Sequence, residues 1–210
     1  SHAGHNVSTI TGDASMLTNG TLERTFTTEY NAASELTDYY DPDFDYSYSR
    51  DQLGRLTSET QSITGLTPTV VFASVYDVAS NRTSLSATIG GTADFKNDST
   101  YDALNRLTRI DQVGQGGGNT VATKRVDFAY NAINQFTQIS RYQATNGTQN
   151  VANSYFTYDT LNRLTDIDHK QSTTVLVGYD LAYDDIHRII SVDSTTDGLS
   201  SYTYDKPSQL

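Results

Sequence analysis

Short runs of alternating apolar and polar residues recur along the chain. Residues 126–130 read VDFAY and residues 179–183 read YDLAY, so aromatic or aliphatic groups occupy every second position. Similar runs cover residues 44–48 and 70–76. A period of two places the apolar groups on one face of an extended segment. The pattern therefore predicts half-buried β-strands.

Each run leads into the same local sequence, most clearly YDALNRLTRI from Tyr101 and YDTLNRLTDI from Tyr158. Further copies start near residues 30, 50, 76, 130, 183 and 204. The spacing varies too much for a solenoid of fixed rung length and favours strands joined by elastic loops. We expect residues 1–210 to form a single repeat array, with residues 1–5 partly a cloning remnant.

The recurring letters predict a β-hairpin in each copy. If Asp102 and Arg106 flank the loop, residues 103–105 fit a type I turn followed by one left-handed residue. That register sets Tyr101 opposite Leu107. The left-handed position then holds residues that tolerate a positive φ, with Ser in the degenerate end copies. These residues are Gly54, Asn105, Asn134, Asn162, His187, Ser34 and Ser208.

The copy that starts at Tyr76 carries one extra letter in this alignment. We expect a four-residue loop, 78–81, that ends in Asn81, and this alignment puts Thr83 at the Leu position. The predicted structural motif residues are Tyr76, Asp77, Asn81, Arg82, Tyr101, Asp102, Asn105, Arg106, Leu107, Tyr130, Asn134, Tyr158, Asp159, Asn162, Arg163, Leu164, Tyr183, Asp184, His187 and Arg188.

Composition agrees with an all-β protein. The 210 residues include 15 Tyr but no Trp, one Met and three Pro, and Tyr with abundant Thr favours strands. We predict repeated antiparallel hairpins that form a long curved or spiralling sheet, with a barrel-like closure as an alternative. The length is sufficient to bury a sizeable core.

Charge and the absence of cysteine exclude several classes of function. The formal net charge is -11, which disfavours binding to nucleic acid. No apolar run is long enough to span a bilayer. With no Cys there is no disulfide framework or thiolate chemistry.

Candidate chemistry is sparse, and a structural interpretation is stronger at each position. Asp41, Asp43 and Asp45 have the spacing of a calcium loop, but the expected Gly and Glu ligand positions hold Tyr46 and Gln52. Asp184 and Asp185 resemble a catalytic pair, yet Asp184 is the turn Asp of its repeat.

The interior histidines, His169 and His187, have no Ser, Cys or second His at a spacing that signals a triad or a zinc site. The segment GQGGGN lacks the Lys of a phosphate-binding loop. We predict no catalytic, metal-binding or cofactor-binding residue, no cofactor, and no enzymatic activity.

The motif Tyr-Asp, variable residues, Asn or Gly, Arg, Leu-Thr resembles the YD repeat of the Rhs family over about residues 30–210. This resemblance covers Rhs and WapA-like polymorphic toxins, the shell components of Tc toxin complexes, and teneurins. It implies a wall segment of a hollow β-shell or stalk in a large secreted or surface-displayed bacterial protein. The implied partners are neighbouring repeats and an enclosed toxin domain.

The sequence departs from the family pattern at several positions. Arg50 replaces the Tyr, and Glu35, Gln135 and Gln209 stand at the Arg position. The conserved block that processes the shell is not seen, and the last copy, YDKPSQL, predicts a segment of a longer array. The alternative is a carbohydrate-binding or cell-surface-binding module, in which Tyr rings would stack on sugars of surface glycans.

Overall fold

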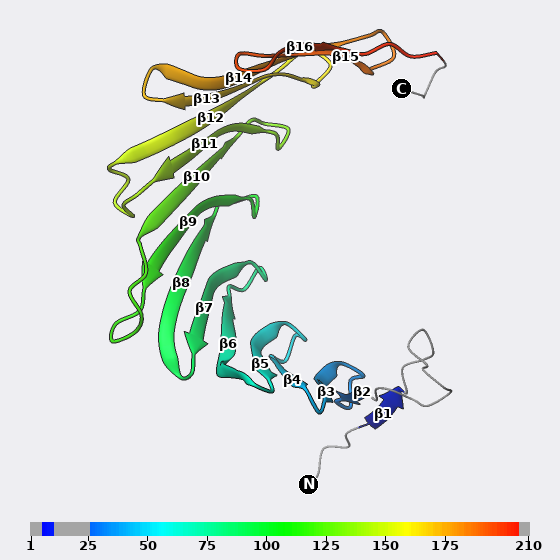
Figure 1. Ribbon diagram of the computed structural model, residues 1–210, viewed down its shortest axis with the longest axis vertical. Helices are drawn as coiled ribbons and strands as arrows, with labels where there is room; N and C mark the ends of the chain where they lie inside the picture. Colours follow the sequence, from blue (N-terminus) through cyan, green and yellow to red (C-terminus); the bar gives the residue numbers. More distant parts are fainter. Residues whose placement is uncertain (1–5, 11–25, 206–210) are drawn as a thin grey trace. The chain divides into compact units, whose positions relative to one another are not determined.

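The protein is described from a computed structural model, in which residues 6–10 and 26–205 are described (Figure 1). The strand positions are β1 (Asn6–Ile10), β2 (Phe26–Tyr30), β3 (Leu36–Asp41), β4 (Phe44–Arg50), β5 (Leu56–Ile63), β6 (Leu66–Tyr76), β7 (Arg82–Ile89), β8 (Thr92–Tyr101), β9 (Leu107–Gly114), β10 (Lys124–Tyr130), β11 (Phe136–Tyr142), β12 (Asn150–Tyr158), β13 (Leu164–Gln171), β14 (Thr174–Tyr183), β15 (Ile189–Ser194) and β16 (Gly198–Ser201). The described residues contain no helix, so the predicted all-β class is confirmed.

The chain forms two compact units, which we describe separately. The first contains the described residues up to 99 together with 113–121, and the second contains 100–112 together with 122–205. Within each unit, strands that are consecutive in the chain pair antiparallel, as the successive ribbons of Figure 1 show. The hairpins predicted from the alternating pattern are therefore confirmed.

Every repeat hairpin for which the pairing register is known contains the same irregularity just before its first turn residue. In the pair β12 and β13, Thr157 lies opposite Asp166 while Tyr158 lies opposite Leu164, so Thr165 is the extra residue of a β-bulge. The Thr165 hydroxyl donates to the Thr157 carbonyl at 3.2 Å. Equivalent bonds from Thr57, Thr83 and Thr108 measure 3.1, 3.3 and 3.1 Å. The bulge explains why Thr recurs after Leu, which the sequence patterns had left unexplained.

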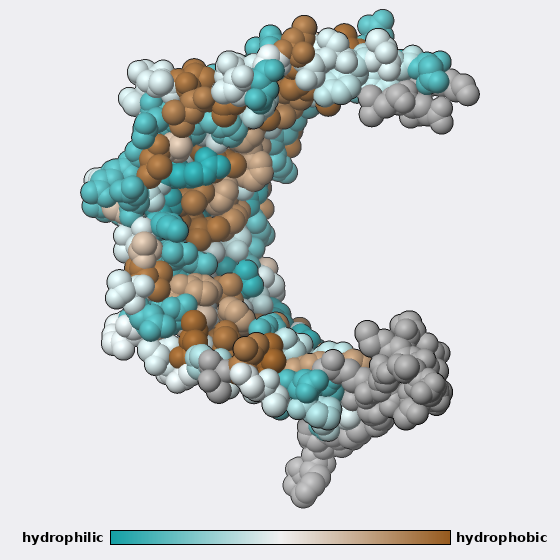
Figure 2. Space-filling model, viewed as in Figure 1, coloured by the Kyte–Doolittle hydropathy of each residue, from teal (hydrophilic) through white to brown (hydrophobic). Residues whose placement is uncertain are grey.

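A conventional core is absent from the described residues, so the expectation of a sizeable core was wrong. Ala87 is the only hydrophobic side chain there that is buried, and the other buried residues are Thr28, Ser84, Ser140, Ser154, Gly178 and Ser194. Each unit is a single layer of sheet, and hydrophobic side chains lie open among hydrophilic ones on the visible face (Figure 2). A single layer leaves apolar side chains half-exposed because no second layer covers them.

Rows of rings across neighbouring strands stabilise each unit in place of a core. In the first unit the Tyr39 ring lies 5.0 Å from the Phe44 ring, measured between centroids, and 5.7 Å from the Phe26 ring. In the second unit Phe136 lies 4.8 Å from Tyr130 and 6.4 Å from Phe156. Cross-strand aromatic pairs of this kind contribute roughly 0.2–1 kcal/mol each. The alternating runs of the sequence thus supply the packing within the sheet.

Candidate functional site: the repeat turn and its staple

The repeat turn has one geometry in all seven described copies that connect two strands. The turns span 31–35, 51–55, 77–81, 102–106, 131–135, 159–163 and 184–188. In the 102–106 turn the Asp102 amide donates to the Arg106 carbonyl at 2.9 Å, and the Asn105 amide donates to the Asp102 carbonyl at 3.0 Å. The predicted three-residue loop, flanked by Asp and Arg, is therefore confirmed.

The predicted left-handed position is confirmed by its backbone torsion angle in every described copy except one. The φ angles are 63° at Ser34, 76° at Gly54, 59° at Asn105, 68° at Asn134, 63° at Asn162 and 69° at His187. Ser208 lies outside the described residues. At Gly54 a side chain would also meet the Glu35 carboxylate, because an added Cβ would lie 2.5 Å from Glu35 Oε1. The torsion favours Gly there, whereas the flexible end of the Glu35 side chain could shift to make room.

The exception is the copy at Tyr76, for which the predicted four-residue loop was wrong. Ser80 has the positive φ, 66°, and the Asp77 amide donates to the Asn81 carbonyl at 3.0 Å. Asn81 therefore occupies the Arg position, and its side-chain amide donates to Asp77 Oδ2 at 3.0 Å. Arg82 lies opposite Tyr76 at the Leu position, and Thr83 is the bulge Thr.

The turn Asp organises the loop by accepting several hydrogen bonds. Asp159 Oδ1 accepts from the amides of Leu161 and Arg163, both at 2.9 Å, and Oδ2 accepts from Arg163 Nε at 2.7 Å. Asp102 and Asp184 make the same bonds to Arg106 and Arg188. The spacing of these letters follows from the reach of one carboxylate to amides two and four residues ahead.

These bonds also favour the ionised carboxylate. The backbone N–H of Arg163 lowers the pKa of Asp159 most, burial opposes that shift, and the Arg163 guanidinium adds to the lowering. The pKa values of Asp102 and Asp184 are lowered for the same reasons. In the 131–135 turn Asn131 and Gln135 replace the ion pair, and Asn131 Nδ2 donates to Gln135 Oε1 at 2.8 Å. The turn geometry therefore does not require charge.

Side chains of one turn also reach the next repeat hairpin, an arrangement that we call the staple. In the second unit Arg106 Nη1 donates to the Asn131 carbonyl at 3.1 Å and to Asn134 Oδ1 at 3.0 Å. The guanidinium carbon lies 4.8 Å from the centroid of the Tyr130 ring. In return, the Tyr130 hydroxyl donates to the Leu107 carbonyl at 2.8 Å. Two successive hairpins are thus joined by bonds in both directions.

The staple recurs in both units. Arg55 and Tyr76 form it in the first unit, where Arg55 Nη1 donates to the Asp77 carbonyl at 2.8 Å and the Tyr76 hydroxyl donates to the Leu56 carbonyl at 2.9 Å. In the second unit Gln135 donates to the Asn162 carbonyl at 2.8 Å. The hydroxyls of Tyr158, Tyr183 and Tyr204 donate to backbone carbonyls at 2.9, 2.7 and 2.7 Å.

One contact was missed from the sequence because it depends on the strand register. Ser154 Oγ lies 2.7 Å from His169 Nδ1, although no spacing had signalled a Ser–His pair. Arg141 Nη1 donates to the same oxygen at 2.8 Å, so the Ser154 hydroxyl bonds both side chains. Ser154 is 0% exposed. The pair lacks access to a substrate, and it orients Arg141.

The remaining candidates lie in separate places. Asp41 Oδ1 accepts from the amides of Asp43 and Phe44 at 2.7 and 3.0 Å, which makes it a turn residue. Asp185 is exposed, whereas Asp184 is part of its turn. The described residues contain no group of three or more His, Cys, Asp or Glu placed to hold a metal ion. The described residues also contain no helix that is long and apolar enough to cross a membrane.

Turns, bulges and staples together define a repeat protein of antiparallel hairpins, which supports the resemblance to YD-repeat proteins at the level of fold. The chain is similar to the crystal structure of TcdB2-TccC3 without its hypervariable C-terminal region, with a TM-score of 0.63 and 16% sequence identity. It is also similar to the crystal structure of TcdB2-TccC3, with a TM-score of 0.62 and 15% identity. Each match covers 85% of this chain and 10% of the other chain. No family model matches the sequence, and no curated protein matches it.

Proposed function

We propose that this chain is a non-enzymatic wall segment of a larger β-shell. The staple carries the proposal, because Tyr and Arg side chains of the repeats bond successive hairpins together while the turn Asp side chains hold their own loops. Arg163, for example, bonds its own turn through Asp159 and the next turn through the Asp184 carbonyl at 3.2 Å. Side chains used in this way support a structural role for the twenty motif residues.

The exposed apolar groups support a role within a larger protein. Each described repeat turn from residue 51 onward carries an exposed aliphatic residue, and the residues are Leu53, Val78, Leu104, Ile133, Leu161 and Ile186. All of them are more than half exposed. Within each unit, exposed apolar residues that recur at the same end of successive hairpins are typical of a surface that other protein covers. Neighbouring repeats of the same large protein are the proposed partners.

The similarity to TcdB2-TccC3, a Tc toxin with a YD-repeat shell, supports the finer part of the proposal. This chain spans about a tenth of the length of that protein. We infer that the complete protein is secreted by a bacterium and that its shell encloses or presents a toxin or effector domain.

Limited proteolysis of the full-length protein tests this proposal. The enclosed domain is expected to resist digestion while the shell is intact. It should become sensitive when Asn162→Val disrupts one repeat turn, whereas Asn162→Gly should leave it protected. Digestion of every domain at the same rate in the intact protein would contradict the proposal.

The alternative of a carbohydrate-binding module has less support. The repeat Tyr hydroxyls at 76, 130, 158, 183 and 204 donate to backbone carbonyls, so they are occupied within the sheet. A glycan array with and without calcium separates the two functions: specific binding that is lost on changing exposed Tyr side chains would favour the module.

A further inference from the structure

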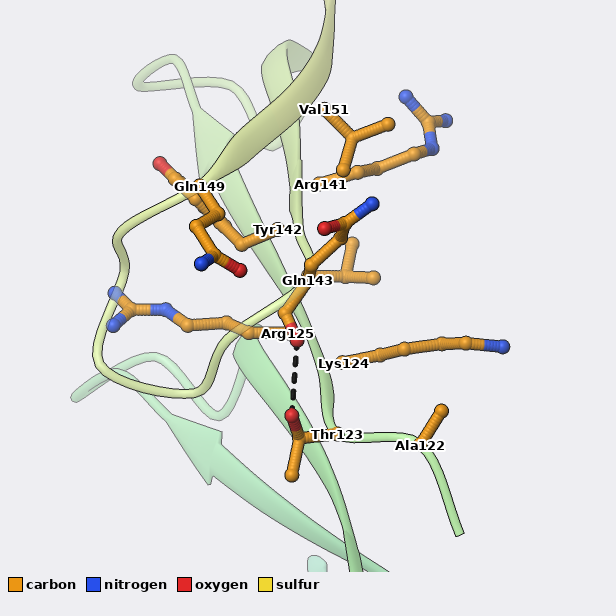
Figure 3. A pocket seen from close by; sticks show the side chains of 10 residues that line it. Ala122, Thr123, Lys124, Arg125, Arg141, Tyr142, Gln143, Gln149 and Val151 are labelled. Carbon is orange, nitrogen blue, oxygen red and sulfur yellow. Dashed lines mark hydrogen bonds between the residues drawn. The ribbon is translucent and has the colours of Figure 1, made fainter.

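A cavity of about 660 Å³ lies where β10 begins, β11 ends and β12 begins in the second unit (Figure 3). Val126 lies opposite Arg141 in the pairing of β10 with β11. Because side chains alternate along a strand, Lys124, two residues before Val126 on β10, belongs to the same face as that pair. Figure 3 shows Lys124 and Arg141 extending to one side, while Arg125 extends to the other. The cavity thus combines two cations with the apolar side chains of Val126 and Val151.

The two cations are unusual in this acidic chain. Eight cationic side chains in the described residues are paired with carboxylates: Arg55, Lys96, Arg106, Arg109, Arg125, Arg163, Lys170 and Arg188. Lys124 and Arg141 have no carboxylate partner among the described residues, and both line the same cavity. In a chain of net charge -11, a local positive site of this kind attracts anions selectively.

The Arg141 guanidinium is held in place from behind. Its Nη1 donates to Ser154 Oγ at 2.8 Å, and Ser154 is buried and bonded to His169. One edge of the guanidinium is therefore fixed, whereas the exposed side chain of Lys124 is not anchored. A positioned guanidinium beside a mobile ammonium suits a carboxylate, which accepts charge-assisted hydrogen bonds from both.

We propose that this cavity binds an acidic peptide segment, in which an Asp or Glu side chain lies next to an aliphatic residue. The carboxylate would contact Lys124 and Arg141, and the aliphatic group would pack on Val126 and Val151. The cavity is half-open, whereas pockets for free small molecules bury most of their ligand. A side chain whose backbone is held elsewhere fits such a site better. This inference goes beyond the wall function and stands independently of it.

The test uses two capped peptides, acetyl-Leu-Glu-Val-amide and acetyl-Leu-Gln-Val-amide, titrated into the 210-residue chain while backbone amide NMR shifts are followed. The Glu peptide should shift the amides of residues 122–126, 141–143 and 149–151, and should weaken with added salt. The Gln peptide should bind at least about tenfold more weakly. Equal binding of both peptides, or no shifts with the Glu peptide, would overturn the proposal.

Variants locate the binding site. Lys124→Gln should lower the affinity for the Glu peptide about tenfold, and Lys124→Arg should restore it. Lys96→Gln is the matched control, because the Lys96 ammonium pairs with Asp98 in the first unit, and it should leave the affinity unchanged. An equal loss of affinity in Lys124→Gln and Lys96→Gln would mean that the peptide responds to the overall charge of the chain and not to this cavity, which would overturn the proposal. Free valerate that binds as tightly as the Glu peptide would overturn the assignment to a polypeptide.

Discussion

At one end of each repeat hairpin the chain turns through the same five-residue span, whereas at the other end it returns through loops of different lengths. The repeat turns 131–135 and 159–163 share their hydrogen bonds almost atom for atom. The return loops include the pair Gly90 and Gly91 after β7, and the longer segment 143–149 after β11. The two ends of the same hairpins therefore follow different rules.

The difference between the two ends shows which interactions keep the residues of the repeat turns constant from copy to copy. A repeat turn must satisfy its own loop amides and also bond the next repeat hairpin, so nearly every position has a defined partner. A return loop also bonds its neighbours, but through contacts that differ from one loop to another. In the loop 143–149 the Thr145 carbonyl accepts from Arg109 and Arg125. Repetition in this sequence therefore follows the hydrogen bonds between hairpins.

The largest effect is expected at the left-handed position of a repeat turn. Asn162→Val should lower the free energy of unfolding by about 1–3 kcal/mol, because a β-branched residue is strained at a φ of 63°. Asn162→Gly is the matched control and should stay close to the parent, since Gly adopts this torsion freely. Urea denaturation measures both values. A Val variant as stable as the Gly variant would contradict the claim that the positive φ at position 162 restricts which residues the repeat turn can hold.

The next effect concerns charge at the turn. Asp159→Asn should lower the melting temperature more than the double variant Asp159→Asn, Arg163→Gln, because the double variant reproduces the neutral pair of Asn131 and Gln135. The pKa of Asp159 is lowered in the folded chain. Its contribution is therefore complete above about pH 4, the ordinary Asp value, and is lost as the pH falls further.

Melting curves between pH 7 and pH 3 check both statements about the turn Asp. The parent should lose more stability than the double variant on acidification. At neutral pH the double variant could instead lose as much stability, relative to the parent, as the single variant does. In that case charge, rather than the hydrogen-bond pattern, keeps these letters constant.

The staple should contribute a smaller amount per bond. Tyr183→Phe removes the hydroxyl that donates to the Leu164 carbonyl at 2.7 Å, and should cost about 0.5–1.5 kcal/mol. Tyr202→Phe is the control, because the 38% exposed Tyr202 has no side-chain hydrogen bond among the described residues. The difference is measured by urea denaturation. Equal losses in the two variants would mean that the hydrogen bond from the Tyr183 hydroxyl adds no stability of its own.

The smallest effect is expected at Asp166 on β13, between the repeat turn and the return turn, and it should be stabilising. Burial, a hydrogen bond shared with Asp180, and the Asp168 carboxylate raise the pKa of Asp166. Asp166→Asn should therefore raise the free energy of unfolding at neutral pH by less than about 1 kcal/mol, since like charges lie opposite each other on β13 and β14. The gain should shrink as the pH falls, because the raised pKa lets Asp166 of the parent bind a proton at a higher pH than an ordinary Asp does.

Asp185→Asn, at an exposed turn position, is the control for Asp166→Asn and should change little. Urea denaturation at pH 7 and pH 4.5 measures both variants. A destabilised Asp166→Asn chain at neutral pH would mean that the facing carboxylates are held apart by contacts stronger than their repulsion.

Local chemistry made the turns predictable from the sequence. The left-handed residues Gly54, Asn105 and Asn162 were recognised because few residue types tolerate a positive φ. The error at Asn81 arose because the alignment followed the Arg letters. The turn Asp sets the frame instead: the left-handed residue lies three positions after Asp77, at Ser80. The recurrent Thr after Leu was a visible signal of the bulge that had no assigned role.

Contacts that depend on register between distant residues could not be predicted. Ser154 meets His169 only because β12 and β13 pair in one particular register. Lys124 and Arg141 come together for the same reason across β10 and β11. The nearly absent core also escaped prediction, since alternation is the same whether or not a second layer covers the sheet.

The most direct test compares two insertions at opposite ends of β13. Two Gly residues are placed between Thr160 and Leu161 in the repeat turn, or between Ser172 and Thr173 in the return turn, and urea denaturation gives both free energies of unfolding. The return-turn insertion should cost only about 0.6 kcal/mol, the entropy of a longer loop. The repeat-turn insertion should cost clearly more, because it separates Asp159 from its amide donors and from Arg163. Equal costs, or a larger cost in the return turn, would contradict the claim that the repeat turn and its staple hold the sheet together.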